Sequence, residues 1–438
     1  MPELDFDALR EKLIQTDTLK YSGKVQMIAG LTVEASGPAV QIGEMCRIYS
    51  LNGESFIPAE MVGFRDKKVL LMPYGDMAGV GPGSRVVSTN KSLKVPVGMN
   101  YLGRVLDGIG RPMDGGPPVE PQEMYPVEAQ PPNPITRPRI HDVLPLGVRA
   151  IDGLLTVGRG QRIGIFAGSG VGKSTLLGMM ARNAKSDVNV ITLIGERGRE
   201  VNDFLQKDLG AEGLKRSVVV VASSDQPALI RAKCAQVGTA VAEYFRDRGM
   251  NVLLMMDSLT RYAMAQREIG MAVGEPPVSR GYTPSVYTVM PKLLERTGTS
   301  SKGTITALYT VLVEGDDLNE PITDTARGIL DGHIVLSRAL ANRNHYPAID
   351  VLASVSRLMP DIVPREHYDS ASKLKSLMAV HNDAQDLINI GAYRAGSNPE
   401  IDLSIKLHPK INAFLNQRVD EFTGYDETVQ RVLTLEAN

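Results

Sequence analysis

The sequence predicts an α/β fold with a parallel-sheet core, an N-terminal β-barrel and a C-terminal helical domain. From Gly160 onward, short apolar runs alternate with longer helical segments, which favours a parallel sheet with right-handed crossovers. Before this region, short apolar runs are separated by turn residues, as in a small barrel. After it, apolar residues recur at helical spacing. We therefore expect four parts: a helical segment over residues 1–22, the barrel over 23–90, the core over 91–360 and the helical domain over 361–438.

The N-terminal segment and the barrel are predicted from short apolar patterns. Phe6, Leu9 and Leu13 would share one side of an amphipathic helix, which either binds a partner or packs locally. The barrel strands are expected where apolar runs lie between turns such as Asn52-Gly53. These runs are residues 25–28, 39–42, 46–49 and 69–72.

A proline-rich stretch precedes the alternating region. Nine prolines lie between residues 112 and 138, and proline both fixes φ and removes a backbone donor. The stretch is therefore predicted to be neither helix nor central strand. We expect an extended connector laid over a domain surface, with a free linker as the alternative.

The core and the tail are predicted from the period of their apolar residues. Strands are expected at residues 163–167, 190–194, 217–222 and 252–256, and helices at 173–184, 201–208, 227–248 and 260–273. From about residue 361, apolar residues such as Leu374, Leu377 and Met378 recur at helical spacing. The tail is therefore expected to be helical.

The composition excludes several classes of protein. Lys and Arg number 48 and Asp and Glu number 50, so the formal charge of −2 argues against a dedicated nucleic-acid binder. Cys46 and Cys234 lie far apart and form neither a metal-ligand spacing nor a disulfide framework, which favours a reducing compartment. The acidic N-terminus lacks a signal-peptide pattern, and no apolar run approaches the roughly 20 residues of a membrane span. We expect a soluble cytosolic protein.

A glycine-rich loop follows the first core strand and opens a helix. Its sequence from Ala167 is Ala-Gly-Ser-Gly-Val-Gly-Lys-Ser-Thr, and glycines let backbone N–H groups approach a phosphate while the helix directs its positive end there. Lys173 would reach the β- and γ-phosphates and the Ser174 hydroxyl would ligate Mg²⁺. The core is therefore predicted to be a P-loop ATPase domain, with ATP bound by Gly168, Ser169, Gly170, Val171, Gly172, Lys173, Ser174 and Thr175.

Acidic residues at two further strand ends complete the predicted site. Asp257 ends the apolar run 252–256 and would hold the Mg²⁺ shell, although an Asp at this place can simply cap a helix. Glu196 follows the strand 190–194, at the edge where ligand sites of α/β sheets form. It is the candidate general base, and Glu200 is a candidate for the Mg²⁺ water shell. The alternative for both is a solvated charged turn, because neighbouring Glu and Arg often pair on a surface.

Several long motifs make the chain similar to the flagellar protein-export ATPase family. They are the run 157–180, Gly-Glu-Arg-Gly-Arg-Glu over 195–200, Met-Asp-Ser-Leu-Thr-Arg-Tyr-Ala over 256–263, Gly-Glu-Pro-Pro over 274–277, residues 331–338 and residues 345–350. The resemblance covers residues 23–425. This family is homologous to the subunits of rotary ATP synthases, and its injectisome relatives drive type III secretion.

The resemblance implies a homohexameric ring with a central pore and an ATP site between neighbouring subunits. Glu196 matches the catalytic carboxylate of the family, and Lys173 and Ser174 match its phosphate lysine and Mg²⁺ hydroxyl. Arg197 and Arg261 match arginines near the γ-phosphate. The remaining matches are Arg357, as the arginine finger donated by the neighbouring subunit, and Tyr346 and Phe422, as aromatics beside the adenine base.

For three of these residues a plainer interpretation stays open. Arg357 would otherwise form a surface salt bridge, and Tyr346 and Phe422 would otherwise pack in the core. The segment 274–284 matches the loop that faces the central channel.

The implied function is Mg²⁺-dependent ATP hydrolysis that energises flagellar protein export. The implied partners are ATP, further copies of the chain, cytosolic regulator or stalk proteins, export chaperone–substrate complexes and the export gate. The chain would then work in the cytoplasm, peripherally at the face of the export apparatus and its membrane, without nucleic acid.

Three other functions are weighed against it. An injectisome ATPase would use the same chemistry, but residues 345–350 and 390–393 resemble the flagellar proteins more closely. A hexameric RNA motor has a related core, but the barrel sequence lacks interleaved aromatic and basic residues. A rotary ATP synthase subunit is disfavoured by the short helical tail.

Overall fold

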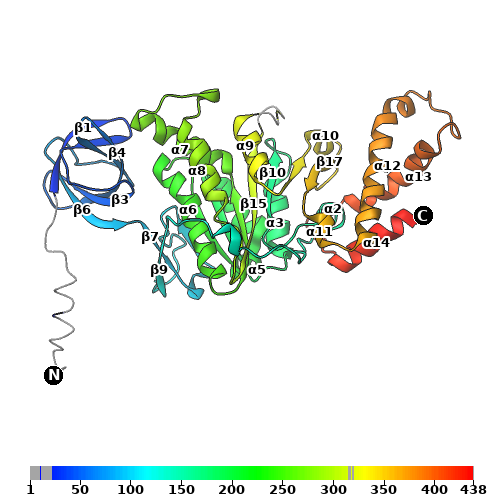
Figure 1. Ribbon diagram of the computed structural model, residues 1–438, viewed down its shortest axis with the longest axis horizontal. Coiled ribbons are helices and arrows are strands. Elements are labelled where there is room, and N and C mark those ends of the chain that lie inside the picture. The colour runs from blue at the N-terminus through cyan, green and yellow to red at the C-terminus, as the bar shows by residue number, and fades with distance from the viewer. Residues whose placement is uncertain (1–9, 11–21, 314–316, 318–319, 438) are drawn as a thin grey trace, which may run out of the picture. The chain divides into compact units, whose positions relative to one another are not determined.

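The computed structural model describes residue 10 and residues 22–313, 317 and 320–437, which Figure 1 draws in colour. The helix predicted over residues 1–22, with Phe6, Leu9 and Leu13, lies outside these residues apart from Arg10 and Ser22. The chain forms two compact units, residues 1–93 with 268–275 and residues 94–267 with 276–438.

A closed antiparallel barrel makes up most of the first unit. Val33, Ile48 and Met61 are fully buried in its interior. Asp66 and Lys67 join two strands with φ values of 47° and 66°, as a two-residue hairpin turn of the primed type requires. In closing order, the strands are β1 (Ser22–Ala29), β2 (Thr32–Ala35), β5 (Lys68–Pro73), β4 (Phe56–Arg65), β3 (Glu44–Tyr49) and β6 (Arg85–Ser92).

One predicted barrel strand is wrong. Residues 39–42 form no strand: Ala39 and Ile42 point into solvent, and Pro38 has no N–H to contribute to a ladder. The strand lies earlier, over Thr32–Ala35, where all four residues are buried. Strands β4 and β6 were missed because Pro58, Glu60 and Gly63 interrupt the apolar residues of β4, and β6 has only Val86 and Val87 before a polar run.

The barrel pairs aromatic and basic side chains from different strands. The Arg47 guanidinium lies 4.8 Å from the ring centroid of Phe56, and that of Arg85 lies 4.4 Å from the centroid of Tyr49. These contacts join β3 to β4 and β6 to β3, so they depend on strand pairing and not on interleaving along the sequence. Each of these two rings therefore carries a guanidinium of the same chain on one face.

The second unit contains a largely parallel sheet. The strand order is β17-β16-β10-β15-β13-β11-β12-β8, with β14 paired to β15. All neighbours are parallel except β17, which runs antiparallel to β16, and β14, which runs antiparallel to β15. The bounds are β8 (Val105–Asp107), β10 (Arg162–Ala167), β11 (Val188–Ile194), β12 (Ser217–Ala222), β13 (Asn251–Asp257), β14 (Gly298–Thr299), β15 (Thr304–Leu312), β16 (Gly332–Leu336) and β17 (Ile349–Ser356).

The helices fill the connections of this sheet, and three of them form the C-terminal domain. Residues 198–209 are helical, first as α4 and then as a π-helical segment. The helix predicted over 201–208 therefore begins earlier, at Gly198. The helices are α2 (Arg149–Leu154), α3 (Lys173–Asn183), α4 (Gly198–Asp203), η3 (Phe204–Leu209), α5 (Gly210–Lys215), α6 (Ala228–Arg246), α7 (Leu259–Val273), α8 (Pro284–Leu294), α9 (Pro321–Ile329), α10 (Arg338–Asn342), α11 (Met359–Ile362), α12 (Arg365–Asn389), α13 (Pro399–Leu415) and α14 (Tyr425–Ala437), with 3-10 turns η1 (Met99–Tyr101), η2 (Pro134–Thr136) and η4 (Ser279–Gly281).

The proline-rich stretch is a connector held on the core, and the free-linker alternative is wrong. Its strand β9 (Glu123–Pro126) pairs only with β7 (Lys94–Val97), and η2 is its one helical turn in the described chain. Arg137 donates to the carbonyl of Thr297 at 2.7 Å, and Arg296 donates to the carbonyl of Val127 at 2.8 Å. The connector is thus tied to the domain in both directions, because Arg137 of the connector donates to a carbonyl of the domain and Arg296 of the domain donates to a carbonyl of the connector.

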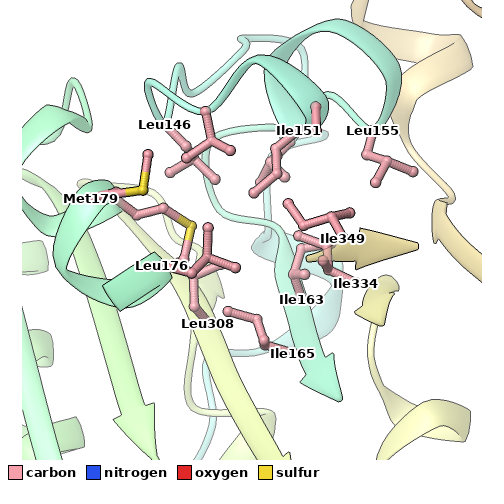
Figure 2. Packing of buried hydrophobic residues seen from close by; sticks show 14 of the residues in the cluster. Leu146, Ile151, Leu155, Ile163, Ile165, Leu176, Met179, Leu308, Ile334 and Ile349 are labelled. Carbon is pink, nitrogen blue, oxygen red and sulfur yellow. The ribbon is translucent and has the colours of Figure 1, made fainter. Parts of the chain in front are cut away.

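A continuous apolar core joins the sheet, the P-loop helix and the C-terminal helices. Figure 2 shows Leu176 and Met179 of α3 beside Leu308 of β15, with Ile165 of β10 nearby. The same cluster continues into the C-terminal helices, which pack around the fully buried helix α2. This packing fixes the start of α3, where the glycine-rich loop ends.

Candidate active site

The loop between β10 and α3 has the backbone that a phosphate cradle needs. Gly170 and Gly172 have φ values of 77° and 90°, a region that residues with a side chain rarely adopt. Gly172 is the N-cap of α3, so the unpaired N–H groups of the first turn face the loop. The usual first glycine is Ala167, which ends β10 in strand conformation and therefore tolerates a Cβ.

Lys173 lies in a buried cluster of charge at the start of α3. Its ammonium is 2.5 Å from Asp257 Oδ1 and 3.6 Å from Glu196 Oε1. The Thr310 hydroxyl donates to the same Asp257 oxygen at 2.7 Å. Burial by itself lowers the pKa of Lys173, but the two carboxylates outweigh it and the pKa is raised, so the lysine keeps its charge.

Glu196 titrates near neutral pH. Burial and the nearby charge of Asp257 raise the pKa of Glu196 to about 7, against the opposing effect of Lys173. A hydrogen bond to Glu200 adds to the rise, and the pKa of Glu200 is lowered because its carboxylate accepts that bond. Glu200 also pairs with Arg197 at 3.1 Å. A carboxyl poised in this way can exchange a proton with water at physiological pH.

A cavity of about 680 Å³ gathers most of the predicted residues. The Arg261 side chain crosses Gly195 at its rim, and its Nε is buried without a hydrogen-bond partner, as expected of a group that awaits an anion. Val171 is buried beneath the loop instead of lining the cavity. The lining comprises residues 167–170, 172–175 and 195–197 with Glu200, Ser224, Arg261, Leu312, Val313 and Arg338.

The donors beside this cavity fit Mg²⁺ bound together with a nucleotide. A second, smaller cavity is lined by Ser174, Glu196, Glu200 and Asp257. The first three of these residues also line the larger cavity. All four offer oxygen, the ligand atom that Mg²⁺ prefers, and this ion usually takes one or two carboxylates plus substrate phosphates. Across the described ranges, no group of three or more His, Cys, Asp or Glu forms a ready-made metal site. Phosphate oxygens would therefore have to complete the shell.

Arg357 lies at the opposite edge of the sheet from the P-loop. It follows β17, whose last residue Ser356 pairs with Gly332 at the start of β16, whereas the P-loop leaves the far end of the neighbouring β10. A strand of five residues such as β16 spans on the order of 15 Å. The guanidinium donates to the carbonyl of Arg327 at 3.3 Å, so this contact is not a salt bridge. Within one chain, Arg357 does not reach the phosphate loop.

The two predicted adenine-side aromatics are both exposed, so neither packs in the core. Tyr346 is 41% exposed and Phe422 is 58% exposed. A Cβ placed on Gly172 would lie 3.6 Å from the Tyr346 ring, so this ring lies against the P-loop. The segment that carries Phe422 joins Tyr346 through the hydrogen bond from Gln417 N to the Tyr346 carbonyl, at 2.9 Å.

Sequence reasoning missed three polar residues of the site. Thr310 lies inside an apolar run, and only the parallel pairing of β13 with β15 places its hydroxyl beside Asp257. Ser224 and Arg338 each lie two residues beyond a core strand, at its carboxyl end. The positions of Ser224 and Arg338 after strands could have indicated both residues, since ligand sites of parallel sheets form at the carboxyl ends of the strands.

Family profiles match three successive parts of the chain. The nucleotide-binding domain of the ATP synthase alpha/beta family matches residues 147–356, and the beta-barrel domain of that family matches residues 25–90. The profile described as the T3SS EscN ATPase C-terminal domain matches residues 363–434. The chain belongs to the type III secretion branch of the ATP synthase alpha/beta family. The fold class expected from the sequence is thereby confirmed.

Relatives from both kinds of secretion system align over nearly the whole chain. The flagellum-specific ATP synthase of Bacillus subtilis is 56% identical over 97% of this chain and 97% of its own. The type 3 secretion system ATPase of Xanthomonas euvesicatoria is 51% identical over 93% of this chain and 92% of its own. The chain is an enzyme of this ATPase class, and the family resemblance stated from the motifs is confirmed.

A solved structure of the same branch has the same fold. The assembled ATPase EscN from the type III secretion system of enteropathogenic E. coli superposes with a TM-score of 0.90 at 47% identity, covering 94% of this chain and all of that one. EscN has also been solved in complex with its central stalk EscO. In the part of this chain that the structure describes, no helix is both long and apolar enough to cross a membrane.

The Thr310 hydroxyl should matter for catalysis because it orients Asp257. Thr310→Val removes a hydrogen bond to a charged group, worth about 1.5–3 kcal/mol, so kcat/KM for ATP should fall roughly 10- to 100-fold. Thr310→Ser keeps the hydroxyl and should retain most activity.

The matched control for Thr310 is Thr306→Val. Thr306 is buried on the same strand and accepts from Gly160 N at 2.8 Å, away from the cavity. Steady-state kinetics of the three variants check this role. An equal loss in Thr306→Val and Thr310→Val would show a general effect on the strand and contradict the role of Thr310.

The pH dependence of hydrolysis should report Glu196. A protonated carboxyl cannot accept a proton from water, so kcat/KM should fall as pH drops below about 7. Glu200→Gln removes a neighbouring negative charge, lowers the pKa of Glu196 and should move this acid limb to lower pH. An acid limb that Glu200→Gln leaves in place would contradict the assignment.

Proposed function

We propose that this chain hydrolyses ATP with Mg²⁺ and that the hydrolysis energises export of flagellar proteins by a type III secretion apparatus. The observation that carries the proposal is the Glu196 carboxyl, 3.6 Å from the P-loop lysine and poised near neutral pH. A P-loop alone binds nucleotide, whereas hydrolysis also needs a group that activates water. The flagellum-specific names of relatives at 56% and 51% identity favour the flagellar system.

The side chains of the cavity divide the work of hydrolysis. Lys173 leaves Asp257 and Glu196 to neutralise the β- and γ-phosphates, while Arg197 and Arg261 contact the γ-phosphate. Glu196 then accepts the proton of the attacking water. Ser174, Asp257 and Glu200 would hold Mg²⁺, which supplies positive charge to the phosphate oxygens when it is bound.

The remaining charge comes from a second copy of the chain in a homohexameric ring. Arg357 lies too far from its own P-loop, so it serves the site of the neighbouring subunit. Each ATP then binds between two copies, with Tyr346 and Phe422 beside the adenine. The assembled state of the related EscN supports a ring of this kind.

In this proposal the chain acts at the cytoplasmic face of the export apparatus, without a role for nucleic acid. The barrel is assigned to residues 23–90, the ATPase domain to 91–360 and the helical domain to 361–438. A stalk protein is proposed as a partner because EscN is solved with EscO. Cytosolic regulators, chaperone–substrate complexes, the export gate and the membrane surface are proposed as further contacts. The relatives give an RNA motor no support, and an injectisome role is the second candidate because of the relative from Xanthomonas.

Mixed rings test the shared site. Glu196→Gln should lose about 10²- to 10⁴-fold in kcat, and Arg357→Ala about 10³- to 10⁵-fold. When the two variants assemble together, a subunit with Glu196 meets a neighbour with Arg357 at about a quarter of the interfaces, which restores activity there. ATPase assays of the singles and the mixture measure this recovery. A mixture that stays as inactive as the singles would contradict the proposed role in trans.

Genetic complementation tests the flagellar assignment. In the source bacterium, deletion of the gene should abolish motility and secretion of hook and filament proteins. The wild-type gene should restore both and Glu196→Gln should restore neither. Glu212→Gln, an exposed carboxyl paired with Lys215 on α5, is the matched control and should restore both. Intact motility together with loss of effector secretion would point instead to the injectisome.

A further inference from the structure

Arg149 is a buried arginine whose partners lie some 270 positions further along the chain. It opens helix α2 at the entrance to the ATPase domain and is 3% exposed. Its guanidinium contacts residues from Phe414, in the last turn of α13, to Thr423, just before α14. A buried guanidinium is costly unless all its donors are satisfied, so these contacts decide how the segment lies.

The guanidinium donates hydrogen bonds to acceptors that have no partner within a helix. Its Nε donates to the carbonyl of Phe414 at 2.8 Å, and Nη1 donates to the Thr423 hydroxyl at 3.2 Å. It also pairs with the carboxylate of Glu421 and donates to the carbonyl of Asn416. Residues 416–424 form neither helix nor strand. One rigid fork therefore holds both ends of an irregular segment.

The backbone of Arg149 holds the same segment through Gln417. Arg149 N donates to Gln417 Oε1 at 2.8 Å, and Gln417 Nε2 donates to the carbonyl of Gly147 at 2.9 Å. The segment in turn holds Tyr346: Tyr346 N donates to Asn416 Oδ1 at 3.0 Å, and Gln417 N donates to the Tyr346 carbonyl at 2.9 Å. The ring of Tyr346 lies against Gly172 of the P-loop. A continuous chain of contacts thus runs from Arg149 to the nucleotide cavity.

A second arginine ties the segment to the P-loop helix. Arg182 of α3 donates to the carbonyl of Val419 at 3.0 Å. Two large aromatics on this assembly, Tyr346 and Phe422, remain exposed although the backbone beneath them is anchored. Exposed apolar rings on a fixed support are typical of a surface that receives a ligand.

We infer that Arg149 is a positioning residue that sets the surface for the base of the nucleotide, formed by Tyr346 and the segment 416–423. This inference rests on the proposed ATPase function. Arg149 touches neither the P-loop nor the catalytic carboxylates, so it acts on the base and not on the phosphates. Its loss weakens binding of ATP but leaves binding of inorganic triphosphate, which has no base.

The experiment compares KM for Mg–ATP with the inhibition constant for Mg–tripolyphosphate in the same assay. Arg149→Lys keeps the charge and loses the fork, so KM for ATP should rise on the order of tenfold, while the inhibition constant stays within about twofold. Arg216→Lys is the matched control. Arg216 also donates to loop carbonyls, those of Ala184 and Ser186, away from the segment, and its change should leave the ratio of the two constants unaltered.

A further variant separates the possible failures. Tyr346→Ala tests the proposed base contact itself, and should raise KM for ATP without altering the tripolyphosphate constant. If Tyr346→Ala gives this split but Arg149→Lys changes both constants equally or neither, the positioning role is overturned and the proposed function stands. If Tyr346→Ala gives no split, the base contact in the proposed function is what fails.

The inference can still be tested if the Arg149 variant does not fold. Should Arg149→Lys fail to fold, Gln417→Ala removes the side-chain hydrogen bonds that join the segment to Arg149 N and to the Gly147 carbonyl, without leaving a buried charge. It should give the same split, and equal changes in both constants would overturn the inference.

Discussion

The direction of the strands in the central sheet decides where each group of the proposed site lies. β10, β11 and β13 belong to the parallel part of the sheet, so Lys173, Glu196 and Asp257 meet at one edge. β17 runs the other way and delivers Arg357 to the opposite edge. One subunit therefore holds the groups that bind phosphate and activate water, but not the arginine that would complete them.

Within that edge, electrostatics couples the three groups. The Lys173 ammonium is buried, which by itself costs free energy, and two carboxylates hold it charged. Burial, together with repulsion from Asp257, raises the pKa of Glu196 to about 7. A triphosphate that draws Lys173 toward itself would change the balance that sets this pKa. Binding and water activation are therefore linked through one lysine in the proposed mechanism.

Much of the site was predictable because its residues follow strands with a clear apolar period. The glycine-rich loop, Glu196 and Asp257 each come directly after such a run, and the parallel order then brings them together. Thr310 was not predictable, since only strand pairing separates it from other threonines of the core. The arginine–aromatic pairs of the barrel and the reach of Arg149 to the C-terminal segment were not predictable either, because both depend on how separate elements pack together.

The most direct test of a site shared between subunits is ATPase activity per subunit, measured against protein concentration while mass photometry follows the fraction of rings. A site that needs Arg357 from a neighbour predicts a steep, cooperative loss of activity per subunit as the rings dissociate. Activity per subunit that stays constant while the protein becomes monomeric would contradict the shared site.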